Sequence, residues 1–424
     1  MRKSSIVIPL KEFSHQYEDA AFIRGEGAYL YDENGTKYID CISGLWNTPL
    51  GYGNERIVKA VSEQAAKLSY VNIYSSMTPV IMNYADKLIS KLSPDFSRFI
   101  YTCSGSESIE CAIKMARKYQ RLKGYNNRHK IAVFDVSYHG TTYAAMSASG
   151  IDQVESKMYG PMVNGFVMLK TPLHITEEEA AADINEKLGD GSEIAAILIE
   201  PVIGSGGIIE VPDWYIEKLK DFAEKNNVLV IFDEVATGFG RTGTLFAYNQ
   251  MNIKPDILTL SKAIDNGVIP MGSVLLSPKV ADFFLEKDQY LEHFSTQNGN
   301  PIACAAASET LDIISDDGLI SHVKELGEYM LTELREKLAD FPIVREVRGR
   351  GLMIGIDLAK ENGQMYDMEF LYEIEGRMKK KGLLIYPFIA GDITSGFSLF
   401  PTFITDKKLA DKIITTVCKV LSSF

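Results

Sequence analysis

The sequence predicts an α/β fold, in which a large domain with a mostly parallel sheet flanked by helices is joined to a smaller α+β domain. The main observation is that short apolar runs alternate with helical stretches through most of residues 95–280, as in right-handed βαβ units. Residues 228–232 are continuously apolar and rich in β-branched side chains, which is typical of a strand buried on both faces. We expect the small domain to be built from the N- and C-terminal segments, with boundaries at 1–53 (N-terminal segment), 54–320 (large domain) and 321–424 (C-terminal part).

The composition is that of an ordinary globular protein, since 46% of the 424 residues are apolar and 24% are charged. A formal net charge of −12 argues against nucleic acid or an anionic membrane as a partner. The five cysteines are scattered without a CxxC pair, and the six histidines never have metal-ligand spacing. The first 16 residues lack a signal-peptide pattern, and no apolar run is long enough to span a membrane. We therefore expect a cytoplasmic protein without a metal site.

An Asn-Gly turn between residues 28–32 and 37–41 predicts a hairpin near the N-terminus. A glycine-rich loop that carries Trp46 follows, and a later loop carries Tyr74. Aromatic side chains in such loops suit a substrate-lining role and ordinary packing equally. The expected helices, the first capped by Asn54, are about 54–68, 78–91, 106–123, 213–226, 299–315, 318–340, 367–381 and 406–421. The expected strands beyond the hairpin are 98–102, 130–135, 194–199, 228–232, 257–260, 343–347, 352–357 and 383–385.

The segment after strand 98–102 has the features of an anion site. Gly105 allows a tight turn, and Ser106 can cap the helix that runs to about residue 123. A strand, a small polar loop and a helix N-terminus together form a ready site for a phosphate group. A plain capped helix is the alternative interpretation. A nucleotide-binding enzyme is a further alternative, but no GxxxxGK[ST] or convincing GxGxxG motif follows a strand here.

The next strands also end in residues that can do chemistry. Strand 130–135 leads to Tyr138 and His139, and strand 194–199 ends at Glu200. An aromatic ring at the carboxyl end of a strand can stack on a flat ligand, although it can equally belong to the core. Because the carboxyl ends of parallel strands open onto the ligand crevice, these side chains are candidates for one site.

Strand 228–232 ends at Asp233, and strand 257–260 is followed by Lys262. A lysine in an apolar crevice has a lowered pKa and can form a Schiff base. An aspartate beside a pyridine nitrogen keeps that nitrogen protonated, with an attraction of roughly 4 kcal/mol at about 4 Å and a dielectric of about 20. That is about three pKa units, enough to make pyridoxal 5′-phosphate (PLP) a strong electron sink. Taken alone, the pair also fits a purely structural interpretation, in which Asp233 caps a loop and Lys262 is solvated.

Taken together, the motifs resemble those of the class III aminotransferases, which are PLP enzymes of fold type I, and of their ω-transaminase-like branch. The resemblance covers nearly the whole chain, in order. Its motifs are GLW at 44–46, SGSES at 104–108, YHG at 138–140, EP at 200–201, DEVATGFGRTG at 233–243, SKA at 261–263, STQNGNP at 295–301 and VRGRGLMIG at 347–355.

The resemblance implies catalytic roles at the matching positions. Lys262 would carry the Schiff base of the internal aldimine and shuttle protons in a ping-pong reaction. Asp233 would pair with the pyridinium nitrogen of PLP. Val235 would pack on one face of the ring, and Tyr138 would stack on the other.

The resemblance also implies roles in holding the cofactor between two subunits. Gly105 and Ser106 would bind the phosphate, while Thr296 would reach across a dimer interface to the phosphate of the partner. Glu200 matches an acid near the cofactor, and His139 matches a neighbour of unassigned role. We therefore expect a homodimer with shared active sites.

Two carboxylate clamps that occur in the family have no counterpart in this chain. Phe397 and Phe400 stand where an arginine and the first proline of a Pro-Pro pair would lie. Tyr386 stands where another branch has an arginine. Thr141 replaces the acid of the YHGDT motif of diaminopelargonate synthases, which disfavours a role in biotin synthesis. The remaining candidates for a carboxylate partner are Arg24, Arg241, Arg348 and Arg350, of which the last three suit structural roles better.

These observations predict a PLP-dependent aminotransferase that moves an amino group between an amine or amino acid donor and an aldehyde or ketone. An amino-sugar or other specialised-metabolite carbonyl would fit a pocket lined by Trp46, Tyr74, Tyr138 and Tyr386. An aminomutase, a decarboxylase or a phospho-lyase on the same scaffold is an alternative, because the pocket selects the bond that PLP breaks. A binding protein without activity is another, although the intact Lys262 and Asp233 argue against it. The sequence leaves the donor and the acceptor open.

Overall fold

The computed structural model describes residues 6–9, 21–151, 153–316 and 318–424. Residues 1–5 and 10–20, which belong to the predicted N-terminal segment and to the stretch without a signal-peptide pattern, lie outside the described residues. A seven-stranded sheet forms the centre of the molecule, in the order β4-β12-β11-β10-β7-β5-β6. Its strands are β4 (Arg98–Thr102), β5 (Lys130–Phe134), β6 (Phe166–Leu169), β7 (Ile194–Ile199), β10 (Leu229–Asp233), β11 (Ile257–Leu260) and β12 (Gly272–Leu276).

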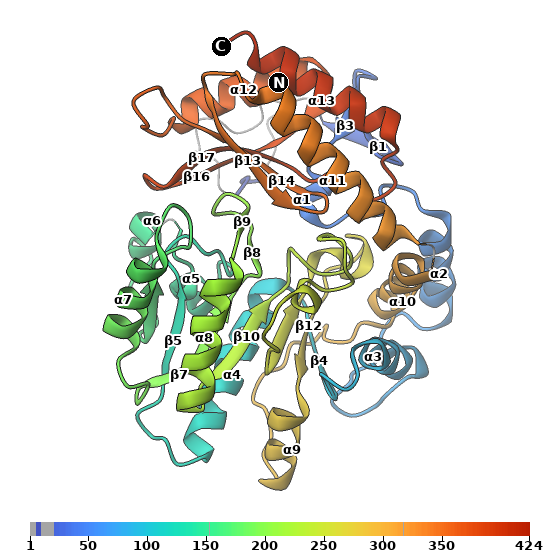
Figure 1. The fold of residues 1–424 in the computed structure, drawn as a ribbon. Helices are drawn as coiled ribbons and strands as arrows, with labels where there is room; N and C mark the ends of the chain where they lie inside the picture. The colour runs from blue at the N-terminus through green and yellow to red at the C-terminus, as the bar shows by residue number, and fades with distance from the viewer. Residues whose placement is uncertain (1–5, 10–20, 152, 317) are drawn as a thin grey trace.

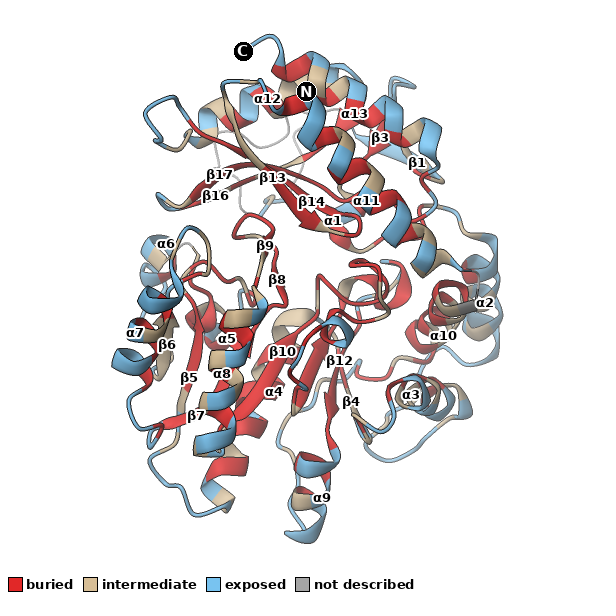
Figure 2. Ribbon diagram, in the orientation of Figure 1, coloured by how far each residue is buried: buried red, intermediate tan, exposed pale blue. Residues whose placement is uncertain are grey.

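The central sheet is mostly parallel, which confirms the predicted α/β class. Every residue of β7, β10 and β11 is buried, as expected for strands covered on both faces. Figure 2 shows these buried strands between helices whose outer faces are exposed. The strand β12, which the sequence pattern did not predict, runs antiparallel to both β11 and β4. As a result, β4 runs parallel to β11.

Helices surround this sheet and connect its strands (Figure 1). They are α2 (Glu55–Lys67), α3 (Pro79–Leu92), α4 (Gly105–Leu122), α5 (Tyr143–Ala148), α6 (Gln153–Lys157), α7 (Glu177–Leu188), α8 (Asp213–Asn226), α9 (Pro278–Glu286) and α10 (Pro301–Asp316). Short elements are α1 (Ser43–Trp46), the hairpin of β8 (Val202–Ile203) and β9 (Ile209–Glu210), and the 3-10 turns η2 (Ala247–Gln250) and η3 (Lys262–Asp265).

The structure shows which residues cap α2 and α4, for which the sequence predicted Asn54 and Ser106. Asn54 caps α2 as expected, because its side chain accepts hydrogen bonds from the backbone N–H of Arg56 and Ile57. The predicted cap of α4 is wrong: Ser104, not Ser106, has the extended backbone of a cap, and its hydroxyl accepts from Glu107 N–H at 3.2 Å. Ser106 therefore lies inside the first turn of α4.

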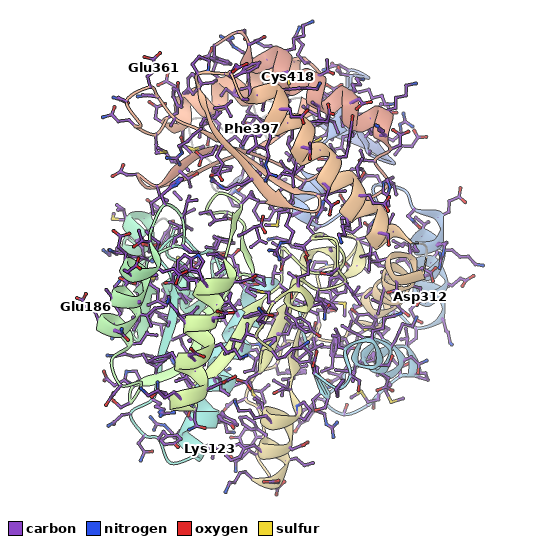
Figure 3. All side chains as sticks on the ribbon, viewed as in Figure 1. Lys123, Glu186, Asp312, Glu361, Phe397 and Cys418 are labelled. Carbon is purple, nitrogen blue, oxygen red and sulfur yellow. The ribbon has the colours of Figure 1, made fainter. Side chains whose placement is uncertain are left out.

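The C-terminal residues form a second, antiparallel sheet in the order β13-β14-β17-β16. Its strands are β13 (Val344–Arg350), β14 (Met353–Leu358), β16 (Tyr386–Ala390) and β17 (Thr394–Leu399). The helices α11 (Leu319–Leu338), α12 (Met368–Lys380) and α13 (Lys407–Leu421) lie with it at the top of Figure 1. Phe397, labelled in Figure 3, is buried on β17.

The N-terminal strands belong to a third sheet, which also includes a strand from the C-terminal part. It consists of β1 (Phe22–Glu26), β2 (Tyr29–Asp32), β3 (Lys37–Asp40) and β15 (Leu383–Leu384), with β3 and β15 parallel. This pairing supports a small domain built from both ends of the chain, while the boundaries at 53 and 320 stay predictions. Among the described residues, no helix is long and apolar enough to cross a membrane.

Candidate active site

Five strands of the central sheet deliver side chains to the same edge. The strands β4, β5, β7, β10 and β11 all run in one direction, so that their carboxyl ends lie together. Asp233 is the last residue of β10. The other candidate residues come just after the remaining strands, and they are Gly105, Tyr138, His139, Glu200 and Lys262. The topology therefore brings together the residues that the sequence singled out one by one.

Asp233 is buried at the end of β10 and is held by hydrogen bonds to both oxygens. His139 Nδ1 lies 2.8 Å from Asp233 Oδ2. The second oxygen, Oδ1, accepts from the backbone N–H of Val235 at 3.0 Å and from the Thr259 hydroxyl at 3.4 Å. Because an ionised carboxylate only accepts hydrogen bonds, Nδ1 is the donating nitrogen of His139. These donors fix the orientation of the Asp233 carboxylate.

Lys262 follows β11 with a strained backbone. Its φ of 43° lies in the left-handed region, which costs a residue with a Cβ about 1–2 kcal/mol. Desolvation lowers the pKa of the Lys262 amine, against the opposing charges of Asp233 and Glu200. A lysine with a lowered pKa has a larger neutral, nucleophilic fraction. Strain of this kind is concentrated at functional sites.

Glu200 is a buried acid between the ends of β5 and β7. Its Oε1 accepts from Tyr138 N–H at 3.0 Å, and its Oε2 accepts from Gly204 N–H at 2.9 Å. Desolvation raises the pKa of Glu200 to about 7. The carboxyl group thus holds the turn that carries Tyr138 in place and changes charge near neutral pH.

An aromatic wall, defined as Trp46, Phe400 and Tyr386, lies beside the lysine. The Trp46 ring stacks on Phe400 with centroids 4.4 Å apart and contacts Tyr386 edge to face at 5.6 Å. The Lys262 amine lies 4.5 Å from the centre of the Trp46 ring. The predicted lining residues Trp46 and Tyr386 are therefore in contact with one another and close to Lys262.

The N-terminus of α4 presents backbone N–H groups that could hold an anion. Within the described part of the chain, the backbone N–H groups of Gly105 and Ser106 have no hydrogen-bond acceptor. A Cβ on Gly105 would lie 2.9 Å from Val235 Cγ1, so close packing requires a glycine at this position. The predicted reason, a tight turn, does not apply, because the φ of Gly105 is not positive. The Ser106 hydroxyl accepts from Thr141 N–H at 3.2 Å and keeps its own proton to donate.

The family model of the class-III aminotransferases matches residues 13–421 of this chain. The chain belongs to the class III aminotransferases. The acetylornithine aminotransferase of Aquifex aeolicus is 36% identical over 405 residues, which cover 94% of this chain and 96% of that protein. Two solved structures are similar across almost their full lengths, as follows. A transaminase from the marine bacterium Virgibacillus has a TM-score of 0.93 at 28% identity, covering 99% of this chain and 97% of that one. An (S)-enantioselective omega-transaminase from Thermomicrobium roseum has a TM-score of 0.90 at 32% identity, covering 98% and 96%.

Class III aminotransferases are PLP enzymes of fold type I, and the residues of this chain fit that cofactor. The unpaired N–H groups at Gly105 and Ser106 suit a phosphate, and the buried carboxylate of Asp233 suits a protonated ring nitrogen. Lys262 would supply the amine for a Schiff base. When bound, PLP supplies the electron sink for the reaction.

Two residues predicted for the site of this aminotransferase lie apart from the others. Tyr74 is 85% exposed, and its ring contacts Phe294 at 6.3 Å. Thr296 is exposed, and its backbone carbonyl accepts from the Tyr70 hydroxyl at 2.8 Å. Among the described residues, neither has a hydrogen bond or ring contact to Lys262. The roles of both residues remain predictions, and that of Thr296 depends on a second subunit.

Arg241 and Arg24 have partners inside this chain. Arg241 is buried, and its Nη1 donates to the carbonyls of Leu352 at 3.2 Å and Pro401 at 2.7 Å. These bonds tie the loop after β10 to the C-terminal part of the chain, as expected for a structural residue. Arg24 lies exposed on β1 and pairs with Glu26 at 2.6 Å. In this structure Arg24 is thus paired with an acid, whereas Arg241 uses only Nη1, and its buried Nε and Nη2 have no partner among the described residues.

The two arginines of β13 attach the C-terminal sheet to the β8–β9 hairpin. Arg348 donates to the carbonyl of Gly207 at 2.8 Å and forms an ion pair with Asp357. Arg350 pairs with Glu210 of β9 at 2.7 Å. Their structural roles are thus as predicted. Thr259 and Phe400 were not predicted as site residues. The parallel register that places Thr259 opposite Asp233 is the signal that could have identified Thr259.

Proposed function

We propose that this aminotransferase moves an amino group between an amine or amino acid donor and an aldehyde or ketone, by a ping-pong reaction in which at least one substrate has no carboxylate next to its reacting carbon. An amino-sugar or other specialised-metabolite carbonyl is the substrate class that we favour. The observation that carries the proposal is the composition of the wall beside Lys262, which is aromatic where a carboxylate-binding arginine would otherwise be expected.

The residues of the chain divide the work of this reaction. The Lys262 amine, with its lowered pKa, would remove a proton from the reacting carbon of the substrate and deliver it to the carbon attached to the cofactor ring. Asp233, oriented by His139, would hold the proton on the ring nitrogen of the cofactor. The aromatic wall excludes water on the side of Trp46.

The wall favours neutral groups over carboxylates. The indole N–H of Trp46 is buried and has no acceptor among the described residues. Phe397, at the position of the missing arginine, is buried in β17. A hydrogen bond to a charged group is worth roughly 1.5–3 kcal/mol, and a carboxylate without such a bond binds weakly here.

We expect carboxylate-free amines to convert the bound cofactor to its amino form in single-turnover experiments. The panel should pair amines that differ only in the carboxylate, such as alanine and 2-aminopropane, and follow the visible absorbance of the cofactor. At least one neutral amine should react in preference to its acidic counterpart. If simple α-amino acids alone react and neutral amines never do, the proposed substrate class is wrong, and another residue holds the carboxylate.

We also propose that the enzyme is a homodimer with shared active sites. Large apolar side chains are exposed near Thr296, including Phe294 and Tyr74, which contact each other at the surface. Exposed apolar groups gathered in this way suit a subunit interface. A second subunit would cover them and would bring its Thr296 to the phosphate cradle at Gly105, as the family resemblance implies.

Subunit complementation tests the shared site. Lys262→Ala lacks the amine, and Thr296→Arg would block the partner's phosphate cradle, so each homodimer should be inactive. After exchange of equal amounts, activity should return to about a quarter of the wild-type value, because half of the dimers are mixed and each has one intact site of two. Lys262→Ala mixed with itself is the control. If the mixture stays inactive although mass measurement shows that the subunits have exchanged, Thr296 does not serve the partner subunit.

A further inference from the structure

Asn266 ends the turn that carries Lys262 and is bonded to a distant segment of the chain. It is the C-cap of η3, with φ 57° and ψ 31°, and only 6% of it is exposed. Its Oδ1 accepts from Leu50 N–H at 2.9 Å, and its Nδ2 donates to the Gly51 carbonyl at 2.9 Å. Both polar atoms of the carboxamide are thus used to join two parts of the chain that lie 216 residues apart in sequence.

Both of the joined segments have a strained backbone. Lys262 has a φ of 43°, and in the segment 43–51 Ser43 and Trp46 have φ values of 48° and 66°. Left-handed residues with a Cβ persist only where the surroundings hold them. The two segments also pack closely, since a Cβ added to Gly267 would lie 2.8 Å from the side-chain nitrogen Nδ2 of Asn47. The hydrogen bonds of Asn266 therefore set how these two strained segments sit against each other.

The contact between these two segments also restricts the position of the Lys262 amine. A free lysine side chain has many rotamers, and a proton-transfer group acts well only when it is held within reach of the reacting atom. The Lys262 amine lies 4.5 Å from the centre of the Trp46 ring, so the position of the Trp46 segment limits where the amine can go.

We propose that Asn266 is a positioning residue: its carboxamide ties the Lys262 turn to the Trp46 segment and thereby holds the Lys262 amine in place for proton transfer. The inference deepens the proposed function, because it rests on the catalytic role of Lys262. It predicts that loss of the carboxamide slows the chemical step more than it weakens substrate binding.

Asn266→Gly removes the carboxamide and keeps a residue that tolerates the left-handed backbone. We expect kcat to fall roughly tenfold to a hundredfold, with the KM for the amine changed by less than about twofold. Asn227 is the matched control: it also ends a helix in the left-handed region, with φ 52°, but is exposed and far from the carboxyl edge of the sheet. Asn227→Gly should leave both constants unchanged.

Asn266→Asp gives a readout that a merely structural residue would not produce. The ionised carboxylate still accepts from Leu50 N–H but faces the Gly51 carbonyl without a proton to donate. When the carboxyl group is protonated, it can make both bonds, and burial raises the pKa of such a group. The kcat of this variant relative to the wild type should therefore rise as the pH falls from about 8.5 to about 6.

The outcomes separate this inference from the function on which it rests. If Lys262→Ala keeps its turnover, the catalytic role of Lys262 fails first. If Lys262→Ala is inactive but Asn266→Gly has a wild-type kcat, the positioning role alone is wrong. If Asn266→Gly does not fold, the pH profile of Asn266→Asp decides, and a flat ratio to the wild type would overturn the proposal.

Discussion

Replacing Lys262 by alanine is expected to lower kcat by about ten-thousandfold, at the upper end of what a positioned acid–base group contributes. The reason is that Lys262 closely follows β11, whose Thr259 lies opposite Asp233 in the neighbouring parallel strand β10. The variant should still bind PLP without a covalent bond. Turnover and the visible absorbance of the purified protein measure the two effects.

Chemical trapping identifies the lysine independently of activity. Borohydride treatment of the wild-type protein should attach the cofactor to the peptide that contains Lys262, and peptide mass spectrometry locates the label. Lys225→Ala, an exposed lysine at the end of α8, is the control and should behave as the wild type. A label on another lysine, or protein without cofactor, would contradict the assignment.

Replacing Asp233 by asparagine is expected to lower kcat about a thousandfold. Asparagine keeps the shape and can still accept from His139, but it lacks the charge that holds a proton on the ring nitrogen. An attraction of roughly 4 kcal/mol at a dielectric of about 20 corresponds to about three pKa units of that nitrogen. Steady-state turnover and the pH dependence of the cofactor absorbance test the prediction.

Glu234 offers a matched control for Asp233. It is the next residue, equally buried, but its carboxylate accepts from Ala247 N–H at 2.7 Å and Tyr248 N–H at 2.8 Å, away from Lys262. Burial raises the pKa of Glu234 to about 7, so that about half of the Glu234 carboxyl groups are already neutral at pH 7. Glu234→Gln should lower the unfolding temperature slightly and leave kcat within a few-fold of wild type. Equal losses in both variants would show that Asp233 acts through the fold and not through its charge.

Much of the large sheet and of the site could be predicted because the signals are local. A buried strand such as β11 is a short apolar run, and the residue that follows it in a parallel sheet faces the crevice. Lys262, Asp233 and Glu200 were found in this way. The motif order then added Gly105, as a candidate phosphate-binding residue, and the wall residue Trp46.

Local signals failed where two alternatives had similar sequences. Ser104 and Ser106 are both good caps, and only the extended backbone of Ser104 decides between them. The strand β12 runs against its neighbours, a direction that depends on how its connections cross the sheet. The stack of Phe400 on Trp46 joins residues from opposite ends of the chain.

The sequence by itself determined the fold class, the family and the candidate residues for cofactor binding, because each of these depends on patterns of a few residues in a fixed order. The tertiary structure decided which side chains surround the amine and how they are held. Thr259 reaches Asp233 through strand register, Phe400 supports Trp46, and Asn266 bonds to a segment 216 residues earlier. Such contacts depend on packing between segments whose separation in sequence carries no periodic signal, so only the folded arrangement shows them.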